Sequence, residues 1–250
     1  MGGRAVPARE HLTARPLTVV VPVYNEGKNF REWWKQASPH LPPGAQVRVV
    51  YDFEEDDTLP VVRELQASGA AVSPLKNAGK RVLGALTTGL RSVDEGPVLV
   101  SMADLSDDFG QIGPMVRAYE EGAKIVVASR YMKGGKQVGG GFVKAGLSRL
   151  GGVSLYWLAG FPAHDATNSF RLYDAAFLRS IEFESDGGFE LGFEITLKAW
   201  MAKQKIVEVP AVWRDRVEGE SRFAFRKWLP KYARLWGKAM VHGLSGARWT

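Results

Sequence analysis

The sequence of 250 residues contains no cysteine, which excludes disulfides, thiolate metal sites and a cysteine nucleophile. A chain without disulfides fits a reducing, cytosolic compartment. No uninterrupted apolar run approaches the ~20 residues that a membrane-spanning helix needs. The N-terminal segment 1–16 also lacks the apolar centre of a secretory signal, so the sequence favours neither secretion nor membrane insertion.

Acidic residues are missing from one end of the chain. Lys and Arg number 33 against 27 Asp and Glu, which gives a net charge of +6. Residues 221–250 carry seven Lys or Arg and no acid, so residues 1–220 are close to neutral. The sequence has no recognised nucleic-acid motif, and we expect no nucleic-acid partner.

Short β-branched runs alternate with amphipathic segments along most of the chain. Strands are predicted at 17–23, 46–51, 97–102, 124–129 and 206–209. Helices are predicted near 29–38, 57–68, 80–92, 109–121, 142–159, 174–181 and 190–203. This alternation predicts an α/β fold with a mostly parallel sheet and helices on both faces. The glycine-rich segment 133–141 predicts a mobile loop.

No linker or internal repeat divides the chain. We expect an N-terminal extension over 1–16, one domain over 17–221 and a basic tail over 222–250.

Chemically informative residues follow three of the predicted strands, where ligands bind in parallel sheets. Asp52 and Asp104 each follow a strand and are candidate ligand contacts. Arg130 follows another, and Lys144 and Ser148 lie four residues apart on the next helix, so the three form a candidate phosphate site. The acids at 54–57 and at 107–108 are equally explained as helix N-terminal residues.

Several of these segments occur in the same order as the motifs of a known protein family. They are VVVPVYNE (19–26), Asp52, ADLS (103–106), SRYMKGG (129–135), DATNSFRLY (165–173) and EVPAVWRDRVEGESRF (208–223). Together they resemble family 2 glycosyltransferases of the GT-A (Rossmann-like) fold, within them the dolichol-phosphate mannose synthase and polyprenol-phosphate glycosyltransferase group. The resemblance implies inverting transfer of a mannose- or glucose-type sugar from a nucleotide sugar to a polyprenyl or dolichyl phosphate.

The resemblance also implies roles for individual residues. Those matching the nucleotide-sugar site are Pro22, Tyr24, Glu26, Asp52, Lys80 and Asp104. Arg130, Lys144 and Ser148 match the acceptor-phosphate site, and Lys144 stands where an Arg is usual. Asp104 and Arg130 are the expected catalytic residues. Residues matching the loop and pocket over the active site are Asp165, Asn168, Arg216 and Ser221, and Glu190 is a further pocket candidate from its place on a helix.

Two departures from the family pattern concern acids. Tyr51 replaces the first acid of the pair that ends at Asp52, and Met102 replaces the first acid of the D-x-D motif. A thioether is a poor ligand for Mg²⁺ or Mn²⁺. A divalent cation would then rest on Asp104, the donor's diphosphate oxygens and water, with Asp107 or Asp108 as further candidates.

Three further polar residues are interpreted from the sequence without the resemblance. We interpret His164, next to Asp165, as structural or substrate-shaping rather than catalytic. Glu190 and Glu194 share one helical face and are candidates to reach the sugar. The segment 165–168 is also explained as a turn with Asx capping.

The basic tail is amphipathic when it is drawn as a helix over 225–240. Its apolar side holds Phe225, Trp228, Leu229, Tyr232, Leu235, Trp236 and Met240, and Lys227, Lys231, Arg234 and Lys238 lie opposite. Pro230 predicts a break at Trp228–Leu229. This pattern favours an interfacial membrane helix at the inner, cytoplasmic face. The same stripe would serve a helix packed on the domain's own sheet.

The sequence is also compatible with two other functions. One is a family 2 glycosyltransferase whose acceptor is a soluble small molecule or a glycan. The other is a catalytically impaired scaffold that binds nucleotide sugars, which Tyr51 and Met102 motivate.

Overall fold

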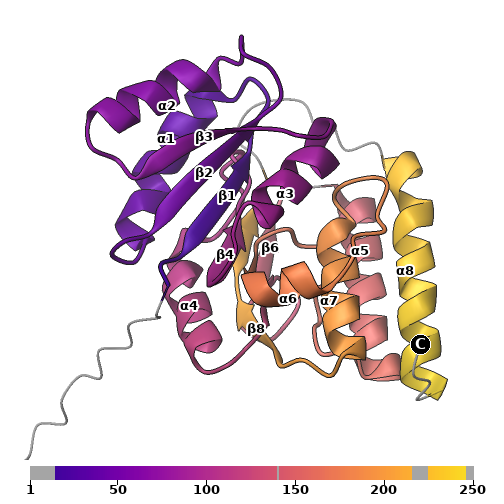
Figure 1. Ribbon diagram of the computed structural model, residues 1–250. Helices are drawn as coiled ribbons and strands as arrows, with labels where there is room; N and C mark the ends of the chain where they lie inside the picture. The colour runs from indigo at the N-terminus through magenta and orange to yellow at the C-terminus, as the bar shows by residue number, and fades with distance from the viewer. Residues whose placement is uncertain (1–14, 140, 216–224, 246–250) are drawn as a thin grey trace, which may run out of the picture.

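The structure is a computed structural model that describes residues 15–139, 141–215 and 225–245. A central sheet carries helices on both faces, and one long C-terminal helix stands beside it (Figure 1). The arrangement confirms the predicted α/β fold.

The central sheet has seven strands in the order β3-β2-β1-β4-β7-β5-β8. Their bounds are β1 Thr18–Pro22, β2 Gln46–Tyr51, β3 Val72–Lys76, β4 Pro97–Val100, β5 Ile125–Ser129, β7 Arg171–Asp174 and β8 Ile206–Pro210. Neighbouring strands are parallel except around β7, which runs antiparallel to both β4 and β5. The carboxyl ends of the parallel strands therefore share one edge, and the segment before β7 enters the sheet from that edge.

Two hydrophobic cores cover the two faces of the sheet. Strand β1 is buried along its length, with Val19 and Val21 in one core and Val20 in the other. The first core also holds side chains of α1 (Gly27–Ala37), α2 (Thr58–Ala67) and α4 (Ile112–Glu120). The second holds side chains of α3 (Arg81–Arg91), α6 (Ala175–Ser180) and α7 (Leu191–Met201). Short 3-10 turns, η1 (Ser38–His40) and η2 (Phe109–Gln111), precede β2 and α4.

All five predicted strands and the seven predicted helices are present, with ends that differ by two residues at most when η2 is counted with α4 and η3 with α5. Four other strands, β3, β6, β7 and β9, were not predicted. β3 contains Pro74, which an edge strand tolerates. β6 (Lys136–Val138) lies inside the glycine-rich segment predicted to be a mobile loop, and it pairs with β9 (Val212–Arg214). That prediction was wrong at 136–138 because the pairing strand lies more than seventy residues away in sequence, beyond the reach of local glycine content.

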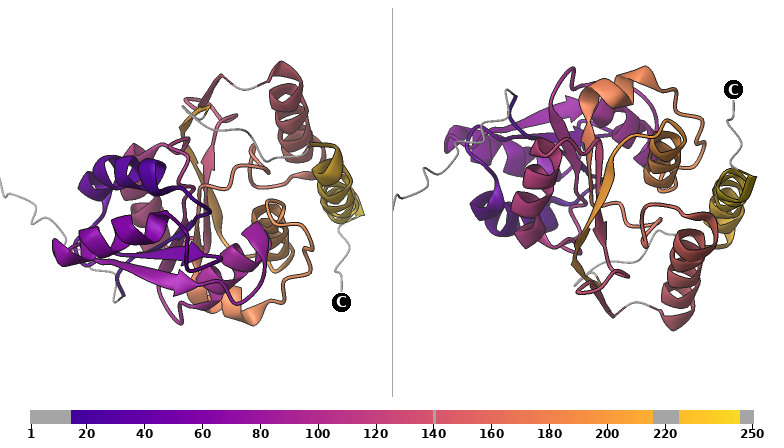
Figure 2. Two further views of the ribbon diagram at one scale, coloured as in Figure 1. Left: turned by 90° about the horizontal axis from the view of Figure 1, so that it is seen from above. Right: turned by 90° about the horizontal axis from the view of Figure 1, so that it is seen from below.

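The predicted helix at 142–159 consists of α5 (Phe142–Ser154) and a π-helical turn, η3 (Leu155–Ala159). Both views in Figure 2 show α5 and α8 (Phe225–Ser245) at the end of the molecule opposite α1 and α2. Among the residues described, no helix combines the length and apolarity needed to cross a membrane.

Helix α8 is continuous, with Pro230 inside it, so the predicted break at Trp228–Leu229 is wrong. Proline at this position removes one hydrogen bond near the helix start, to the carbonyl of Arg226. The apolar stripe after it packs inward: Leu235 and Ala239 are buried, and Tyr232, Trp236 and Met240 pack against the second core. This packing outweighs the lost hydrogen bond and matches the alternative of a tail helix docked on its own domain.

Candidate active site

The loop after β1 is locked to the loop after β2 by reciprocal hydrogen bonds. Asp56 accepts from the backbone N–H of Asn25 (3.1 Å), and Asp57 accepts from that of Gly27 (2.8 Å). Asn25, at φ +51°, returns a bond by accepting from the N–H of Asp57 (3.2 Å). The predicted nucleotide residues of the β1 loop are thereby fixed beside those of β2. Asp57 gives α2 no side-chain cap, so joining the loops explains it better than helix capping does.

Asp52, at the end of β2, is held by a residue at the end of β3. The Asn77 side-chain amide donates to Asp52 Oδ1 at 2.5 Å, and its oxygen accepts from the N–H of Gly79 at 2.8 Å. Tyr24 is 45% exposed, and its ring meets Phe53 edge-on at 5.2 Å between centroids. The predicted donor site thus presents an exposed aromatic side chain beside an oriented carboxylate. Pro22 is buried at the end of β1, while Glu26 accepts from the side-chain amide of Asn29 (2.7 Å).

Asp104 lies in the turn after β4, the next strand along the same edge. Its carboxylate accepts from the N–H of Ser106 at 3.2 Å, and Leu105 between them has φ +63°. Asp107 is buried beneath this turn and accepts from the Ser101 hydroxyl (2.8 Å) and from the N–H of Met102 (2.9 Å). The turn that carries Asp104 is therefore held by a buried carboxylate.

Asp107 has an unusual protonation equilibrium. Burial, and then the negative charge of Asp104, raise its pKa to about 7, against the lowering effects of its two hydrogen bonds and of Arg130. Its second oxygen, Oδ1, is buried without a hydrogen-bond partner. Asp108 serves the fold in another way, because it accepts from the N–H of Val212 in β9 at 3.0 Å.

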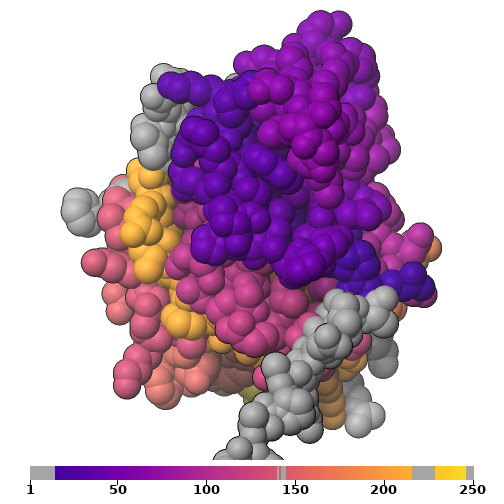
Figure 3. Space-filling model, turned by 90° about the vertical axis from the view of Figure 1, so that its left-hand side faces the viewer, coloured from indigo at the N-terminus to yellow at the C-terminus, as the bar shows by residue number. Residues whose placement is uncertain are grey.

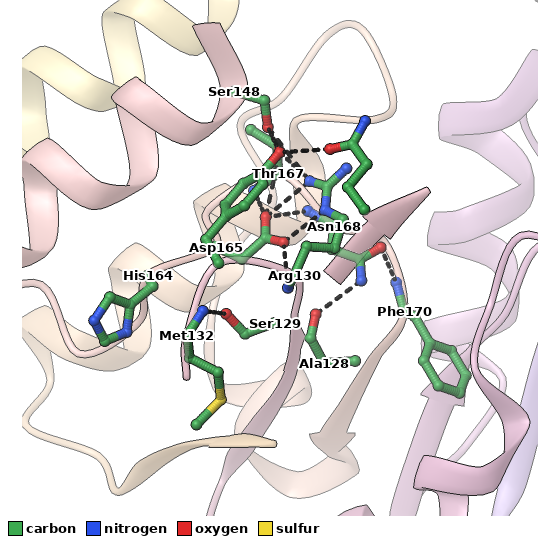
Figure 4. A network of polar contacts seen from close by, with 12 residues as sticks. Ala128, Ser129, Arg130, Met132, Ser148, His164, Asp165, Thr167, Asn168 and Phe170 are labelled. Carbon is green, nitrogen blue, oxygen red and sulfur yellow. Dashed lines mark hydrogen bonds and ion pairs between the residues drawn. The ribbon is translucent and has the colours of Figure 1, made fainter. Parts of the chain in front are cut away.

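Arg130, at the end of β5, forms the centre of a polar cluster (Figure 4). Its Nε and Nη2 donate to the two oxygens of Asp165 at 2.7 and 2.9 Å. Nη2 also contacts the hydroxyls of Thr167 (2.7 Å) and Ser148 (3.3 Å), which brings α5 to the site. Tyr131 donates to Ser148 at 2.9 Å. The structure therefore unites the predicted residues Arg130, Ser148 and Asp165.

The opposite charges of Arg130 and Asp165 balance each other in this cluster. The side chain of Asp165 is fully buried and that of Arg130 is 10% exposed. Burial acts to raise the pKa of Asp165, but the charge and hydrogen bonds of Arg130 outweigh it and lower that pKa. Burial likewise acts to lower the pKa of Arg130, and Asp165 raises it overall. Both groups are thus ionised at neutral pH. Asp165 also accepts from the N–H groups of Thr167 and Asn168, both at 3.1 Å, so the predicted Asx turn is present as well.

Other predicted residues lie further from this cluster. Glu190, at the start of α7, accepts from the N–H groups of Gly187 (2.8 Å) and Gly188 (2.9 Å). Glu194 accepts from those of Glu184 and Ser185, both at 2.7 Å. Both carboxylates therefore fix the loop before α7, and no described contact directs them to a sugar.

Three predicted residues are described only in part or not at all. Lys80 is exposed at the start of α3. Lys144 lies in the first turn of α5, one turn before Ser148, and its side chain is outside the described part of the structure. Arg216 and Ser221 lie outside the described residues.

His164 is engaged away from Arg130. Its Nδ1 lies 2.7 Å from a carboxylate oxygen of Glu208, and its ring stacks on Tyr156 at 3.6 Å. In Figure 4 the imidazole points away from the Arg130–Asp165 pair. This geometry supports the structural interpretation of the histidine.

Sequence reasoning missed the residues that support the site from beneath. Asn77 orients Asp52, and Arg171 donates to the backbone oxygen of Asp165 at 2.9 Å. Trp213 lies 5.8 Å from the Arg130 guanidinium, on β9. Asn77 follows β3 and Trp213 lies on β9, so both depend on strands that local pattern did not predict, and no sequence signal pointed to them.

The seven-stranded sheet, with the single antiparallel strand β7 between β4 and β5, is that of a GT-A glycosyltransferase fold. Residues 18–181 match the family model described as glycosyl transferase family 2. The chain therefore belongs to glycosyl transferase family 2.

Two curated relatives and one solved structure illustrate the similarity. A polyprenol monophosphomannose synthase of Mycolicibacterium smegmatis is 29% identical over 87% of this chain and 84% of its own. An undecaprenyl-phosphate mannosyltransferase of Micrococcus luteus is 30% identical over 84% of this chain and 88% of its own. A glucosyl-3-phosphoglycerate synthase of Mycobacterium tuberculosis, in complex with Mn²⁺, UDP-glucose and phosphoglyceric acid, has a TM-score of 0.61 and 18% identity, covering 93% of this chain and 80% of its own. This likeness bears on the fold alone.

Proposed function

We propose that the protein transfers a mannose- or glucose-type sugar, with inversion, from a nucleotide sugar to the phosphate of a polyprenyl lipid at the cytoplasmic membrane face. The observation that carries this proposal is the Arg130–Ser148 contact, which joins the end of β5 to α5 at the same edge as the donor residues. The names of the two curated relatives support a polyprenyl phosphate acceptor.

Arg130 acts as a positioned donor rather than as a free charge. Asp165 holds its Nε and Nη2, while Nη1 makes no described hydrogen bond and is available to a phosphate oxygen. Because the Arg130–Asp165 pair is nearly neutral, Lys144 would supply the net positive charge for the acceptor phosphate. That phosphate, with a second pKa near ~6, is largely dianionic at pH 7 and attacks without a general base. The chain's task is alignment and neutralisation of opposed negative charges.

The donor would lie along the edge formed by β3, β2, β1 and β4. Tyr24 and Asp52 would contact the nucleotide, with Pro22, Glu26 and Lys80 around them, while Asp165, Asn168, Arg216 and Ser221 would complete the pocket.

The carboxylates in the turn after β4 fit a divalent cation. In the described residues no three acidic or histidine side chains form a ready metal cluster. Asp104, however, offers a carboxylate, and Asp107 beneath it has an oxygen without a partner. Mg²⁺ commonly binds through one or two carboxylates plus substrate phosphates. Asp104 would hold Mg²⁺ or Mn²⁺, which when bound supplies charge stabilisation for the departing diphosphate.

Incubation with GDP-mannose, UDP-glucose and related donors, together with a polyprenyl phosphate and Mg²⁺ or Mn²⁺, tests the proposal. We expect formation of a lipid-linked sugar, lost in Asp104→Asn and in the presence of EDTA. Arg130→Lys should raise the acceptor KM more than the donor KM, since a lysine that keeps the contact with Asp165 has no second nitrogen in the place of Nη1 to donate to the phosphate. Absence of turnover with every donor would overturn the proposal.

A soluble phosphate acceptor is the second candidate. The structure of a protein with a similar fold contains bound phosphoglyceric acid, which supports this alternative. Turnover with phosphoglyceric acid, but not with polyprenyl phosphate in detergent, would favour it. An impaired scaffold would instead bind donor without turnover, even after Met102→Asp.

A further inference from the structure

Most of the large exposed apolar side chains of the described residues lie on α5, η3 and α8. The described residues include nine large hydrophobic side chains with high exposure, and seven of them belong to α5, η3 or α8. The seven are Leu147 (42%), Leu150 (66%), Trp157 (73%), Leu158 (60%), Leu229 (45%), Val241 (51%) and Leu244 (68%). We call these seven residues the α5–α8 apolar surface. Isolated exposed apolar residues need no explanation, but a concentration of this kind marks an interaction site.

Helix α8 presents this surface on the side opposite its core-packed residues. Tyr232, Leu235, Trp236 and Met240 of the predicted stripe pack on the core, whereas Leu229 of the same stripe is exposed, so its predicted placement is wrong. The exposed residues along the described part of the helix are Leu229, Pro230, Ala233, Arg234, Val241, Leu244 and Ser245. Arg234 is the one charged residue in that set. Lys231 and Lys238 are instead directed to the loop before α7, where they pair with Asp186 (2.7 Å) and Glu184 (3.4 Å). Among the described side chains of the helix, the apolar stripe after Pro230 therefore packs inward, and Arg234 is the exposed charge.

Helix α5 and the π-turn η3 extend the surface to the active site. Ser148 of α5 contacts Arg130, while its neighbours Leu147 and Leu150 are exposed. The π-helical turn then exposes Trp157 and Leu158, although Leu155 and Ala159 of the same turn are buried. Helix α8 is anchored to η3 by close contact between Gly243 and Ala159. One helix, α5, therefore separates the predicted acceptor-phosphate site from the apolar surface.

Charge on these elements has one sign. Residues 142–159 and 225–245 contain no Asp or Glu, but they contain Lys144, Arg149 and five further Lys or Arg, of which Lys231 and Lys238 pair with acids of the loop before α7. A protein surface of this kind complements the anionic headgroups of a lipid leaflet. Exposed Trp and Leu flanked by basic residues suit the boundary between headgroups and acyl chains. The other occupant to consider, a second copy of this chain, would bring like charges together.

We propose that the α5–α8 apolar surface docks the protein on a bilayer containing anionic lipids, with Trp157 and Leu158 inserted between the headgroups. The proposal rests on the proposed function for its purpose, because the hydrocarbon chain of a polyprenyl acceptor stays in the membrane while its phosphate reaches Ser148 and Arg130. The stripe Tyr232–Leu235–Trp236–Met240 has no part in docking, since it is packed on the core.

Flotation with vesicles of phosphatidylcholine and phosphatidylglycerol tests the docking directly. We expect the wild-type protein to float with the vesicles. The double variant Trp157→Ala/Leu158→Ala should bind the vesicles at least about tenfold more weakly than wild type, because two inserted side chains are lost. Leu150→Glu should have a similar effect. The matched control is Ala67→Glu, which adds the same charge at an exposed position of α2, at the opposite end of the molecule. Unchanged flotation of the double variant would overturn the proposal.

Two further measurements separate this proposal from its rivals. A short-chain, water-soluble prenyl phosphate should be used equally well by wild type and by the double variant, whereas a long-chain acceptor in vesicles should be used several-fold less by the variant. If no prenyl phosphate is used but the protein floats, the proposed function fails and the docking surface stands. If light scattering shows a dimer that the double variant dissociates, while flotation is unaffected, the surface binds a second copy and the proposal is wrong.

Discussion

At the residue scale, the Arg130–Asp165 pair serves both stability and placement of the predicted acceptor group. A buried carboxylate facing a nearly buried guanidinium leaves an uncompensated charge when either partner is removed. Positioning at this site therefore depends on residues that local sequence pattern does not connect.

We expect Asp165→Ala to lower the free energy of unfolding by about 3–5 kcal/mol, because Arg130 loses its counter-ion in a buried setting. Thr167→Val is the control, since it removes a hydroxyl contact from the same cluster and should cost about 1 kcal/mol. Urea denaturation at pH 7 measures both. Equal losses in the two variants would contradict the role given to the ion pair.

The raised pKa of Asp107 leads to a prediction about how stability depends on pH. Its pKa is raised from 3.8 to about 7 in the folded protein, so folding favours the protonated form. The unfolded chain loses this proton at lower pH, and stability from this group therefore falls as pH rises from about 4 to about 7. Asp107→Asn removes the titration.

Relative to wild type, the Asp107→Asn variant should gain about 2–3 kcal/mol between pH 5 and pH 8, at 1.36 kcal/mol per pKa unit. Paired urea titrations in EDTA at the two pH values measure this gain. Asp104 and Arg130 are present in both proteins, so the difference reports the ionisation of Asp107 together with its interaction with these two charges. A difference that does not vary with pH would show that Asp107 is ionised throughout.

At the scale of elements, the docking of α8 on η3 depends on a glycine. A Cβ at Gly243 would collide with the carbonyl oxygen of Ala159, whereas nothing lies within 4 Å of a Cβ at Gly237 in the same helix. Gly243→Ala should destabilise the protein by about 1–3 kcal/mol. Gly237→Ala should stabilise it by about 0.5–1 kcal/mol, because alanine is the better helix former.

Thermal melting of the two alanine variants is a matched test, since the same substitution is made six residues apart. Gly243→Ala should also reduce vesicle flotation, because Val241 and Leu244 lose their fixed relation to Trp157. Equal melting temperatures would contradict the close contact between α8 and η3.

At the scale of the whole molecule, the charge of +6 predicts salt-dependent association with anionic vesicles. Raising the salt from 0.1 M to 1 M shortens the screening length from about 10 to about 3 Å. We expect flotation with phosphatidylglycerol vesicles to fall about fivefold or more over this range, while binding to neutral phosphatidylcholine vesicles stays weak. Salt-independent flotation would mean that Lys and Arg contribute nothing to docking.

Much of the fold followed from local pattern, because strands such as 46–51 are continuous apolar runs between amphipathic helices. The strand ends then located Asp52, Asp104 and Arg130 on one edge. Local pattern could not find β7, whose four residues are too short to show a period, or the pairing of β6 with β9. It also found the amphipathy of α8 but not which side faces the body, since that depends on tertiary contacts.

The antiparallel strand β7 also fixes the order in which the molecule can be completed. It stands between β4 and β5 but follows both in the chain. During synthesis, β4 and β5 therefore emerge before the strand that joins them, and the sheet stays in two parts until Asp174 has left the ribosome. The donor edge, built from residues before 105, belongs to the first part and the acceptor cluster to the second. We expect nascent chains ending before β7 to expose unpaired strand edges and to need protection from aggregation.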